Sequence, residues 1–417
     1  MSSDWKRVKL DQALCINPKV PMIKGKEYPF VEMSSVEANN KNVKAKEIRT
    51  FKGSGSRFVE GDTIMARITP CLQNGKISRY KAFNQEKHAH GSTEFIVLRH
   101  RENITHKEFV YYLTISDQVK PYAISQMNGS SGRQRVPVDS FKHLEINLPP
   151  IAEQKAIADI LSSLDEKIEL NRQICKTLED IASTLFKSWF IDFDPVKAKA
   201  EGRAPEGISP ETAALFPDSF EDSPKGRIPK GWKLTTLKEV ALNFDSKRIP
   251  LSNREREKRR GYYPYHGATG VLDYLDDYIF DGIYLLLGED GSVVKEDGTP
   301  FTQYVRGKFW VNNHAHVLQG IYPISTEHLY LFIRQLNISP FITGAVQPKL
   351  NQKNMYSIPF VKPDKEICRH FAKIVSPLFE RIYALRQEIK SLEKIKNSLI
   401  PELLIGKIRM NKGTGIK

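Results

Sequence analysis

The chain has 417 residues, of which 40% are hydrophobic and 27% charged, a composition typical of a globular protein with two or three domains. No apolar run approaches the roughly 18 residues of a membrane span, and the N-terminal stretch has no hydrophobic secretion signal. The four cysteines are far apart and form no C-x-x-C pair, which argues against a metal site and predicts reduced thiols in the cytoplasm. The net charge of +14 favours a polyanionic partner, and without membrane features we expect nucleic acid.

Residues 1–148 are predicted to form a domain of mixed α and β structure. Short apolar runs bounded by polar or turn residues predict strands at Tyr28–Met33, Glu94–Leu98 and Leu144–Leu148. The segment HKEFVYYLTI predicts a helix that includes Phe109–Leu113, and glycine-rich turns separate the remaining segments.

A long helix is predicted over Ile151–Phe190, within a spacer region assigned to residues 149–194. Pro149-Pro150 stands before it, where a missing N–H is tolerated, and Asp194-Pro195 is expected to close it, because the residue before proline avoids the helical region. Apolar residues recur at steps of three and four, as on one face of a helix. This stripe consists of Ile157, Leu161, Leu164, Ile168, Leu178, Ile181, Leu185 and Trp189.

The same stripe occurs a second time after Pro363. One constant offset carries every stripe position onto another apolar residue, namely Phe371, Val375, Leu378, Ile382, Leu392, Ile395, Leu399 and Leu403. Asn171, which interrupts the first stripe, corresponds to Leu385 in the second. Two long helices with matching stripes are predicted to pair as in a coiled coil, with Asn171 as a polar layer that fixes the register. The alternative is that each stripe packs only on its own domain.

The domain plan also repeats. Residues 195–230 are rich in proline and are expected to form a loose connector with one short helix at Pro210–Leu215. Residues 231–362 then restart the plan of the first domain, and residues 363–417 form the second helix and a tail. Four matches occur in the same order: Trp5 with Trp232, Gly61–Ala66 with Asp281–Leu286, His88–Thr93 with Asn313–Leu318, and Gln134 with Gln347.

Motifs of catalysis are weak or missing. The sequence has no P-loop for nucleotide hydrolysis. Phe51–Gly55 has the F-x-G-x-G spelling of S-adenosylmethionine-binding methyltransferases, but the preceding residues are charged, so we interpret it as a surface turn. Asn147–Pro150 differs from the N-P-P-[YF] motif and is better interpreted as a helix start. His314 and His316 alternate as on a strand without a third metal ligand, so we expect no metal and no catalytic centre.

Polar and basic residues instead gather on loops that occur at comparable places in both halves. Arginine and lysine suit phosphates and guanine edges, whereas asparagine and glutamine suit adenine edges. Any one loop could be a solvated turn, but the duplication favours a DNA-binding role. The candidate DNA-binding residues are Arg67, Thr69, Gln73, Asn74, Lys76, Ser130, Arg133, Gln134, Arg135, Arg259, Arg260, His266, Thr269, Asn312, Asn313, His314, Gln347 and Lys349.

Several segments resemble the specificity subunits of type I restriction–modification systems. They are Leu148–Gln154 and Leu185–Asp194 around the first helix, Ile228–Trp232 after the connector, and Leu399–Ile408 near the C-terminus. The second copy departs from the pattern, because Pro363–Ile367 lacks the Glu-Gln pair of the first. The resemblance extends over the whole length of the chain.

The resemblance implies an α+β fold with two similar DNA-recognition domains separated by two long antiparallel coiled-coil helices. It implies that each domain binds one half of an asymmetric, bipartite site in double-stranded DNA, and that the helices dock two modification subunits, which in turn bind restriction subunits. S-adenosylmethionine, ATP and Mg would be bound by those partners, and this chain would bind no cofactor. The expected spacer and subunit-interface residues are Ile157, Leu161, Leu164, Ile168, Asn171, Leu178, Leu185, Phe371, Leu378, Ile382, Leu385, Leu392 and Leu399. The alternative function is that of a single-chain DNA methyltransferase or nuclease with its own recognition domain.

Overall fold

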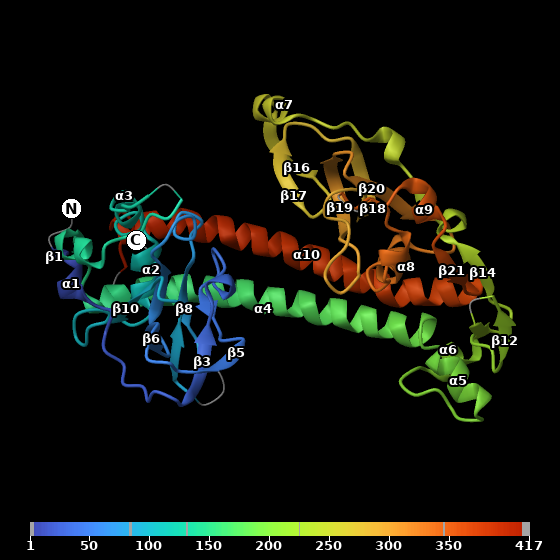
Figure 1. Ribbon diagram of the computed structural model, residues 1–417, viewed down its shortest axis with the longest axis horizontal. Helices are drawn as coiled ribbons and strands as arrows, with labels where there is room; N and C mark the ends of the chain where they lie inside the picture. Colours follow the sequence, from blue (N-terminus) through green and yellow to red (C-terminus); the bar gives the residue numbers. More distant parts are fainter. Residues whose placement is uncertain (1–3, 83–85, 131, 225, 345–346, 411–417) are drawn as a thin grey trace. The chain divides into compact units, whose positions relative to one another are not determined.

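The structure is a computed structural model that describes residues 4–82, 86–130, 132–224, 226–344 and 347–410. Residues 411–417 of the predicted C-terminal tail lie outside these ranges. The chain divides into two compact units: the first contains the residues up to Asn171 and those from Glu388 on, and the second is Arg172–Gln387. Both are built from α and β structure (Figure 1), in agreement with the predicted fold class. Within the described ranges, no helix is both long and apolar enough to cross a membrane.

Among its described residues, the first unit contains three sheets. The five-stranded sheet has the order β2 (Leu14–Ile16), β10 (Phe95–His100), β7 (Thr63–Ala66), β8 (Ile77–Tyr80) and β4 (Asn42–Val43). The four-stranded sheet has the order β5 (Glu47–Thr50), β3 (Glu27–Val31), β9 (His88–Gly91) and β6 (Ser56–Val59), and β1 (Lys6–Lys9) pairs with β11 (Glu145–Leu148). The helices α1 (Leu10–Ala13), α2 (Phe109–Ile115) and α3 (Lys120–Ser125) accompany them. The three predicted strands and the predicted helix correspond to β3, β10, β11 and α2, with slightly different bounds.

The second unit repeats this plan with one larger sheet. Its order is β15 (Ala241–Asn243), β20 (Ala315–Gly320), β18 (Phe280–Gly288), β19 (Thr302–Val311), β16 (Arg260–His266) and β17 (Val271–Leu275). A separate pair joins β14 (Lys233–Thr236) to β21 (Pro359–Lys362). The helices are α7 (Asn253–Lys258), α8 (Thr326–Ile333) and α9 (Gln352–Tyr356).

Equivalent hydrogen bonds fix which residues correspond in the two units. The amide of Leu10 donates to the carbonyl of Leu144 at 2.8 Å, and Leu237 donates to Ile358 at the same distance. Leu10 therefore corresponds to Leu237, which makes the predicted match of Trp5 with Trp232 correct.

Two other predicted matches have the wrong register. Ala66 lies opposite Phe95 in the first unit, and Gly288 lies opposite Ala315 in the second. Ala66 thus corresponds to Gly288 rather than to Leu286, and the counterpart of β20 is β10 rather than the segment that begins at His88. The error arose because similar short apolar strings recur in neighbouring strands, and only strand pairing shows which of them are equivalent.

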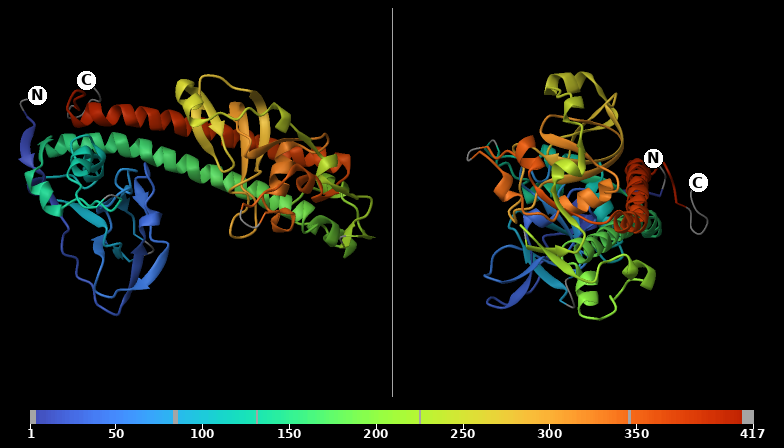
Figure 2. Two further views of the ribbon diagram at one scale, coloured as in Figure 1. Left: turned by 45° about the horizontal axis from the view of Figure 1, so that its top comes forward. Right: turned by 90° about the vertical axis from the view of Figure 1, so that its right-hand side faces the viewer.

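The two long helices are confirmed. They are α4 (Ile151–Phe190) and α10 (Lys365–Leu404), with 40 residues each, and they run side by side in Figures 1 and 2. In the second unit Cys175 lies against Ile382 and Phe186 against Phe371, so the numbers rise along one helix and fall along the other. The helices are therefore antiparallel.

The start of the connector differs from the prediction. α4 ends at Phe190, before Asp194-Pro195, and Phe193 has the left-handed φ of 56°. Pro195 lies instead in the first turn of another helix, α5 (Asp194–Ala200), where its missing N–H does no harm. The rest of the connector contains α6 (Pro210–Ala214) and a hairpin of β12 (Phe220–Ser223) and β13 (Gly226–Pro229), so it has more regular structure than its proline content indicated.

Most of the predicted stripe faces the interior, with one matched exception. The thirteen residues expected at the helical seam are all buried or half-buried. Ile181 and Ile395, however, are 49% and 48% exposed, whereas Ala182 and Phe186 are buried. The two isoleucines correspond to each other under the helix offset, so the same position leaves the stripe in both helices.

A buried ion pair joins α4 to α10 in the first unit. The ammonium of Lys396 lies 2.7 Å from the carboxylate of Asp165, and both side chains are over 90% buried. The hydroxyl of Tyr112 on α2 donates to the other carboxylate oxygen at 2.6 Å. Under the helix offset, the apolar residues Phe379 and Ala182 take these two positions in the second unit, and both are buried.

We expect Asp165→Ala to lower the free energy of unfolding of the first unit by about 3–5 kcal/mol, because the charge of Lys396 would remain buried without a partner. The double variant Asp165→Phe, Lys396→Ala copies the other unit and should recover most of this loss. Denaturant-dependent hydrogen exchange of residues 388–404 measures both. A single variant as stable as the wild type would show that water reaches Lys396.

Candidate nucleic-acid interface

The two predicted loops of the first unit lie against each other just beyond β7. The amide of Thr69 donates to the carbonyl of Gln134 at 3.0 Å, and the amide of Gln134 donates to the Thr69 hydroxyl at 3.0 Å. The amide of Val136 donates to the carbonyl of Arg67 at 2.8 Å. Thr69 and Gln134 are 65 residues apart in the sequence, so two distant segments form one paired surface element.

The cations of this element differ in how they are held. Arg135 makes a forked contact with the carboxylate of Glu94, at 2.8–3.0 Å, which fixes a planar guanidinium at the surface. Lys76 is half-buried and donates to the carbonyl of Met33 at 2.8 Å, so its charge is already engaged. Of the other predicted residues, Gln73, Asn74, Ser130 and Arg133 are exposed. Ser131 of the same loop lies outside the described residues.

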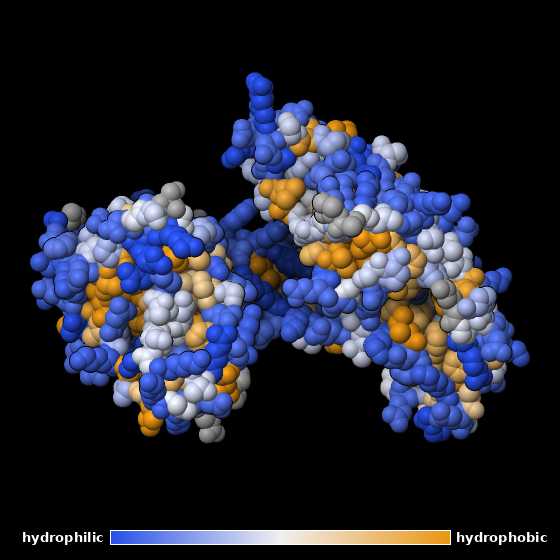
Figure 3. All heavy atoms as spheres, in the orientation of Figure 1, coloured by the Kyte–Doolittle hydropathy of each residue, from blue (hydrophilic) through white to orange (hydrophobic). Residues whose placement is uncertain are grey.

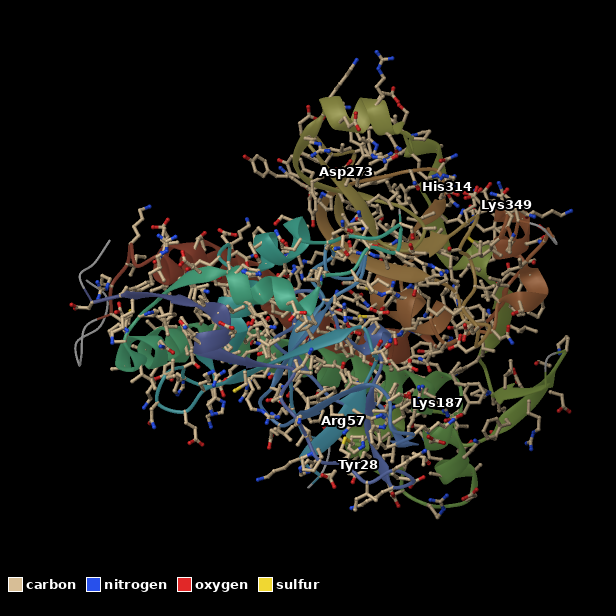
Figure 4. All side chains as sticks on the ribbon, turned by 60° about the vertical axis from the view of Figure 1, so that its left-hand side comes forward. Tyr28, Arg57, Lys187, Asp273, His314 and Lys349 are labelled. Carbon is tan, nitrogen blue, oxygen red and sulfur yellow. The ribbon has the colours of Figure 1, made fainter. Side chains whose placement is uncertain are left out.

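The second unit builds the same element from different side chains. The amide of Glu289 donates to the carbonyl of His314, and the amide of Leu350 donates to the carbonyl of Glu289, both at 2.8 Å. In the first unit Arg67 makes the same two contacts, with Glu94 and Val136. The correspondence therefore joins Arg67 to Glu289, Glu94 to His314, and Arg135 to Lys349. Figure 4 shows His314 and Lys349 on neighbouring loops.

These assignments correct one predicted match and separate exposed from buried candidates. Because Arg135 corresponds to Lys349, Gln134 corresponds to Pro348 rather than to Gln347. Asn312 is buried, and its side chain accepts the amide of His314 at 2.9 Å, so it shapes the turn. Exposed candidates at or near this element in the second unit are Thr269, Asn313, His314, Gln347 and Lys349.

A buried polar network supports the loops of the second unit. His316 is 1% exposed, and its ring nitrogens contact the carboxylate of Asp245 at 2.6 Å and the carbonyl of Leu350 at 2.7 Å. Burial alone would raise the pKa of Asp245, but hydrogen bonds and the charge of His316 outweigh burial and lower it. Asp245, Glu289 and His316 could offer ligands to a metal ion. The guanidinium of Arg248, 2.6 Å from Glu289, already supplies a cation there, so we assign no metal.

The basic run around α7 divides into structural and exposed residues. Arg256 contacts Asp273 at 3.4 Å, and Arg259 contacts Asp276 at 3.1 Å and lies over the ring of Trp310. These arginines fasten α7 and β16 to β17. Arg254, Lys258 and Arg260 are exposed and form no ion pair in the described part of the chain. Arg259 and Arg260, predicted alike from the sequence, thus have different surroundings.

His266 is also less accessible than the sequence suggested. It is 7% exposed, its Nδ1 lies 2.7 Å from the amide oxygen of Gln303, and its ring packs edge-on against Phe309. The side chain of Gln303 in turn donates to the carbonyl of Gly267, so the two side chains brace the hairpin turn.

An edge strand pair that both units share was predicted only in part from the sequence. β3 lies parallel to β9 with Phe30 beside His90, and β16 lies parallel to β19 with Tyr265 beside Trp310. β5 and β17 then add the outer strands. The strand at Tyr28–Met33 was predicted, but its counterpart was not, although the strings Tyr28-Pro29-Phe30 and Tyr263-Pro264-Tyr265 are similar; proline is tolerated near a sheet edge.

The F-x-G-x-G segment is a surface turn around one buried ring. Phe51 is 2% exposed and packs against Tyr28 and His90. A Cβ on Gly55 would lie 2.5 Å from the carbonyl oxygen of Gly91, so this glycine serves a close approach of two backbones.

The geometry defines an internally duplicated protein in which paired surface loops recur on two α/β units joined to an antiparallel helix pair. The family model "Type I restriction modification DNA specificity domain" matches residues 3–180 and 229–394. The chain belongs to this family.

Individual relatives agree with this assignment. The chain is similar to the type I restriction enzyme HindI specificity subunit of Haemophilus influenzae, at 27% identity over 97% of the chain and 100% of that relative. It is also similar to the MjaIX specificity subunit of Methanocaldococcus jannaschii, at 26% identity over 73% of the chain and 70% of that relative. The crystal structure of the type I restriction–modification S subunit from M. genitalium has a similar fold, with a TM-score of 0.57, 17% identity and 97% coverage of each chain.

We expect Arg260→Ala to flatten the dependence of DNA affinity on salt by about one unit of log–log slope, if this exposed arginine neutralises one phosphate. Arg259→Ala serves as the matched control: it should lower the melting temperature, because Asp276 loses its cation, and change the slope less. Binding of the assembled complex to duplex DNA at several salt concentrations gives both slopes. Equal slopes for wild type and Arg260→Ala would mean that this arginine touches no phosphate.

Proposed function

We propose that the chain is the non-catalytic specificity subunit of a type I restriction–modification complex, and that each recognition domain binds one half of a bipartite, asymmetric DNA site. The observation that carries this proposal is the duplicated loop element. Both units make the same backbone contacts, yet Arg67 stands in one where Glu289 stands in the other. One backbone frame with different side chains fits a site whose two halves differ in sequence.

The partners follow from the same proposal. Two modification subunits would dock on the helices and bind restriction subunits in turn, and these partners would hold S-adenosylmethionine, ATP and Mg. The complex would act in the cytoplasm on double-stranded DNA. We also propose that the continuous helices α4 and α10 set the distance between the two half-sites. The alternative, a single-chain methyltransferase or nuclease, has little support, because its best motif is the turn at Phe51–Gly55.

Two exposed isoleucines support docking of two like subunits. Ile181 in the second unit and Ile395 in the first occupy corresponding helix positions and are both about half exposed. Large apolar side chains exposed at repeated positions are a common feature of protein-binding surfaces. A pseudo-symmetric pair of such positions suits two copies of one partner.

We therefore expect Ile181→Asp and Ile395→Asp each to weaken the docking of one modification subunit, and the double variant to weaken both. A buried carboxylate without a partner opposes association strongly. Native mass spectrometry of the complex counts the subunits. Leu242→Asp is the control, because Leu242 is 48% exposed and lies on β15 rather than on a long helix. Full assembly of both isoleucine variants would contradict this docking surface.

The test of the proposed function is a domain exchange. Replacing residues 1–148 by the corresponding domain of a relative with a different site should change one half of the methylated sequence and leave the other, because each domain carries its own loops. A methylation map of the host genome gives the result. As a control, the purified chain alone should transfer no methyl group from labelled S-adenosylmethionine to DNA. A change in both half-sites would contradict the two-domain assignment.

A further inference from the structure

The edge hairpin of the second unit presents an apolar face to solvent. On β16 and β17, Pro264 lies opposite Tyr274, and the exposed side chains of Tyr262 and Leu272 lie near this pair, each at one of the two bulges in the strand pairing. Tyr262 is 93% exposed, Leu272 56% and Tyr274 47%. In Figure 3 an apolar area lies over this hairpin within a mostly hydrophilic surface.

The opposite face of the same hairpin is rigidly packed. Tyr265 and Leu275 are fully buried and form a cluster with Trp310. The Tyr265 hydroxyl accepts the amide of Leu251 at 3.0 Å, and the guanidinium of Arg256 lies 5.2 Å from the centre of the Tyr265 ring. The exposed face is therefore held in one position, as a recognition surface requires.

The surroundings of this face carry positive charge. α7 and the start of β16 contribute the exposed cations Arg254, Lys258 and Arg260. Of the neighbouring acids, Asp273 and Asp276 are engaged by Arg256 and Arg259, Glu255 caps α7, and Glu257 is exposed, so cations exceed free acids here. An apolar strip with cations at its rim complements duplex DNA, in which phosphates flank the groove. The apolar group that the major groove offers to such a strip is the thymine methyl.

The first unit has the equivalent strand pair, β3 with β5, although β4 lies between these two strands in the sequence. The shared positions of Phe30 and Tyr265 align Ile48 with Tyr274, and Glu27 takes the position of Tyr262, where β16 has a bulge and β3 pairs regularly. The strand arrangement is thus common to both units and the outward side chains differ, as an element that distinguishes two half-sites needs.

We propose that the apolar face of the β16–β17 hairpin, with Tyr262 at its most exposed position, determines the sequence preference of the second domain by contacting base edges that include a thymine methyl. This inference rests on the proposed function, which assigns DNA recognition to the domain but not to this hairpin.

The test selects preferred sites from a pool of randomised duplex DNA, using the full chain assembled with the modification subunits of its system. Tyr262→Ala should lower the preference at one or more base pairs of one half-site by about tenfold, and leave the other half-site unchanged. Tyr262→Phe keeps the ring and should keep the preference. Tyr322→Ala, which removes another exposed tyrosine of the second unit, should change nothing. Because Tyr262 is almost fully exposed, its substitution leaves the folded core intact.

A second measurement addresses the methyl contact directly. Replacing thymine by deoxyuridine in the affected half-site should weaken binding of the wild type, and should weaken binding of Tyr262→Ala much less. Equal wild-type affinity for the thymine and deoxyuridine sites would overturn the apolar contact. The same would follow if Tyr262→Phe were as impaired as Tyr262→Ala.

The outcomes also separate this inference from the proposed function. If the wild type selects no two-part site, the proposed function fails. If the wild type selects such a site and Tyr262→Ala selects the same one, only the hairpin assignment fails. Loss of subunit assembly in Tyr262→Ala would show a protein-binding surface instead, and would also overturn the assignment.

Discussion

The antiparallel pairing of α4 and α10 is the constraint on which the rest of the structure depends. Each unit contributes a segment of both helices, so neither unit's core is complete without residues far away in the sequence. The attachment is short: β11 ends at Leu148, three residues before α4 begins at Ile151, and β21 ends at Lys362, three residues before α10 begins at Lys365. Because β11 pairs with β1 and β21 pairs with β14, each α/β body is tied directly to the start of a helix.

The two units show how one backbone arrangement can carry two different sets of surface side chains. Hydrogen bonds between main-chain groups hold the paired loops, and these bonds do not depend on which side chains the loops carry. The first unit therefore tolerates an Arg135–Glu94 ion pair where the second has Lys349 and His314. Below the loops the second unit adds the buried His316 network, which anchors a carbonyl next to Lys349. The backbone hydrogen bonds of the loops are repeated in both units, whereas the side chains that the loops expose differ.

The sequence predicts elements that depend on local periodicity. It does not predict contacts that depend on the pairing of strands distant in the sequence. Apolar spacing alone located α4, because steps of three and four residues are a property of the helix itself. The different surroundings of Arg259 and Arg260 could not be predicted, since they depend on Asp276, which strand pairing brings to Arg259. Ile181 is exposed although it fits the apolar spacing, because the apolar face of a straight helix drifts relative to a seven-residue repeat. Packing then decides that Ala182 rather than Ile181 faces inward. The edge strand pair was only partly predicted, because β9 and β19, along which β3 and β16 lie, are distant from them in the sequence.

The residues that depart from the ordinary division between apolar interior and polar surface are the informative ones in this chain. Polar and charged groups are buried where position must be fixed: Asp165 and Lys396 between the helices, and the His316 ring beneath the loops. A buried pair of charges adds little net stability over an apolar pair, as Phe379 and Ala182 illustrate at the equivalent positions, but it strongly disfavours any register that separates its members. Large apolar groups are exposed at Ile181, Ile395 and Tyr262, where the helices and the edge hairpin face solvent. Burial of such positions against a partner would remove apolar surface from water, which is why the proposals above place partners there.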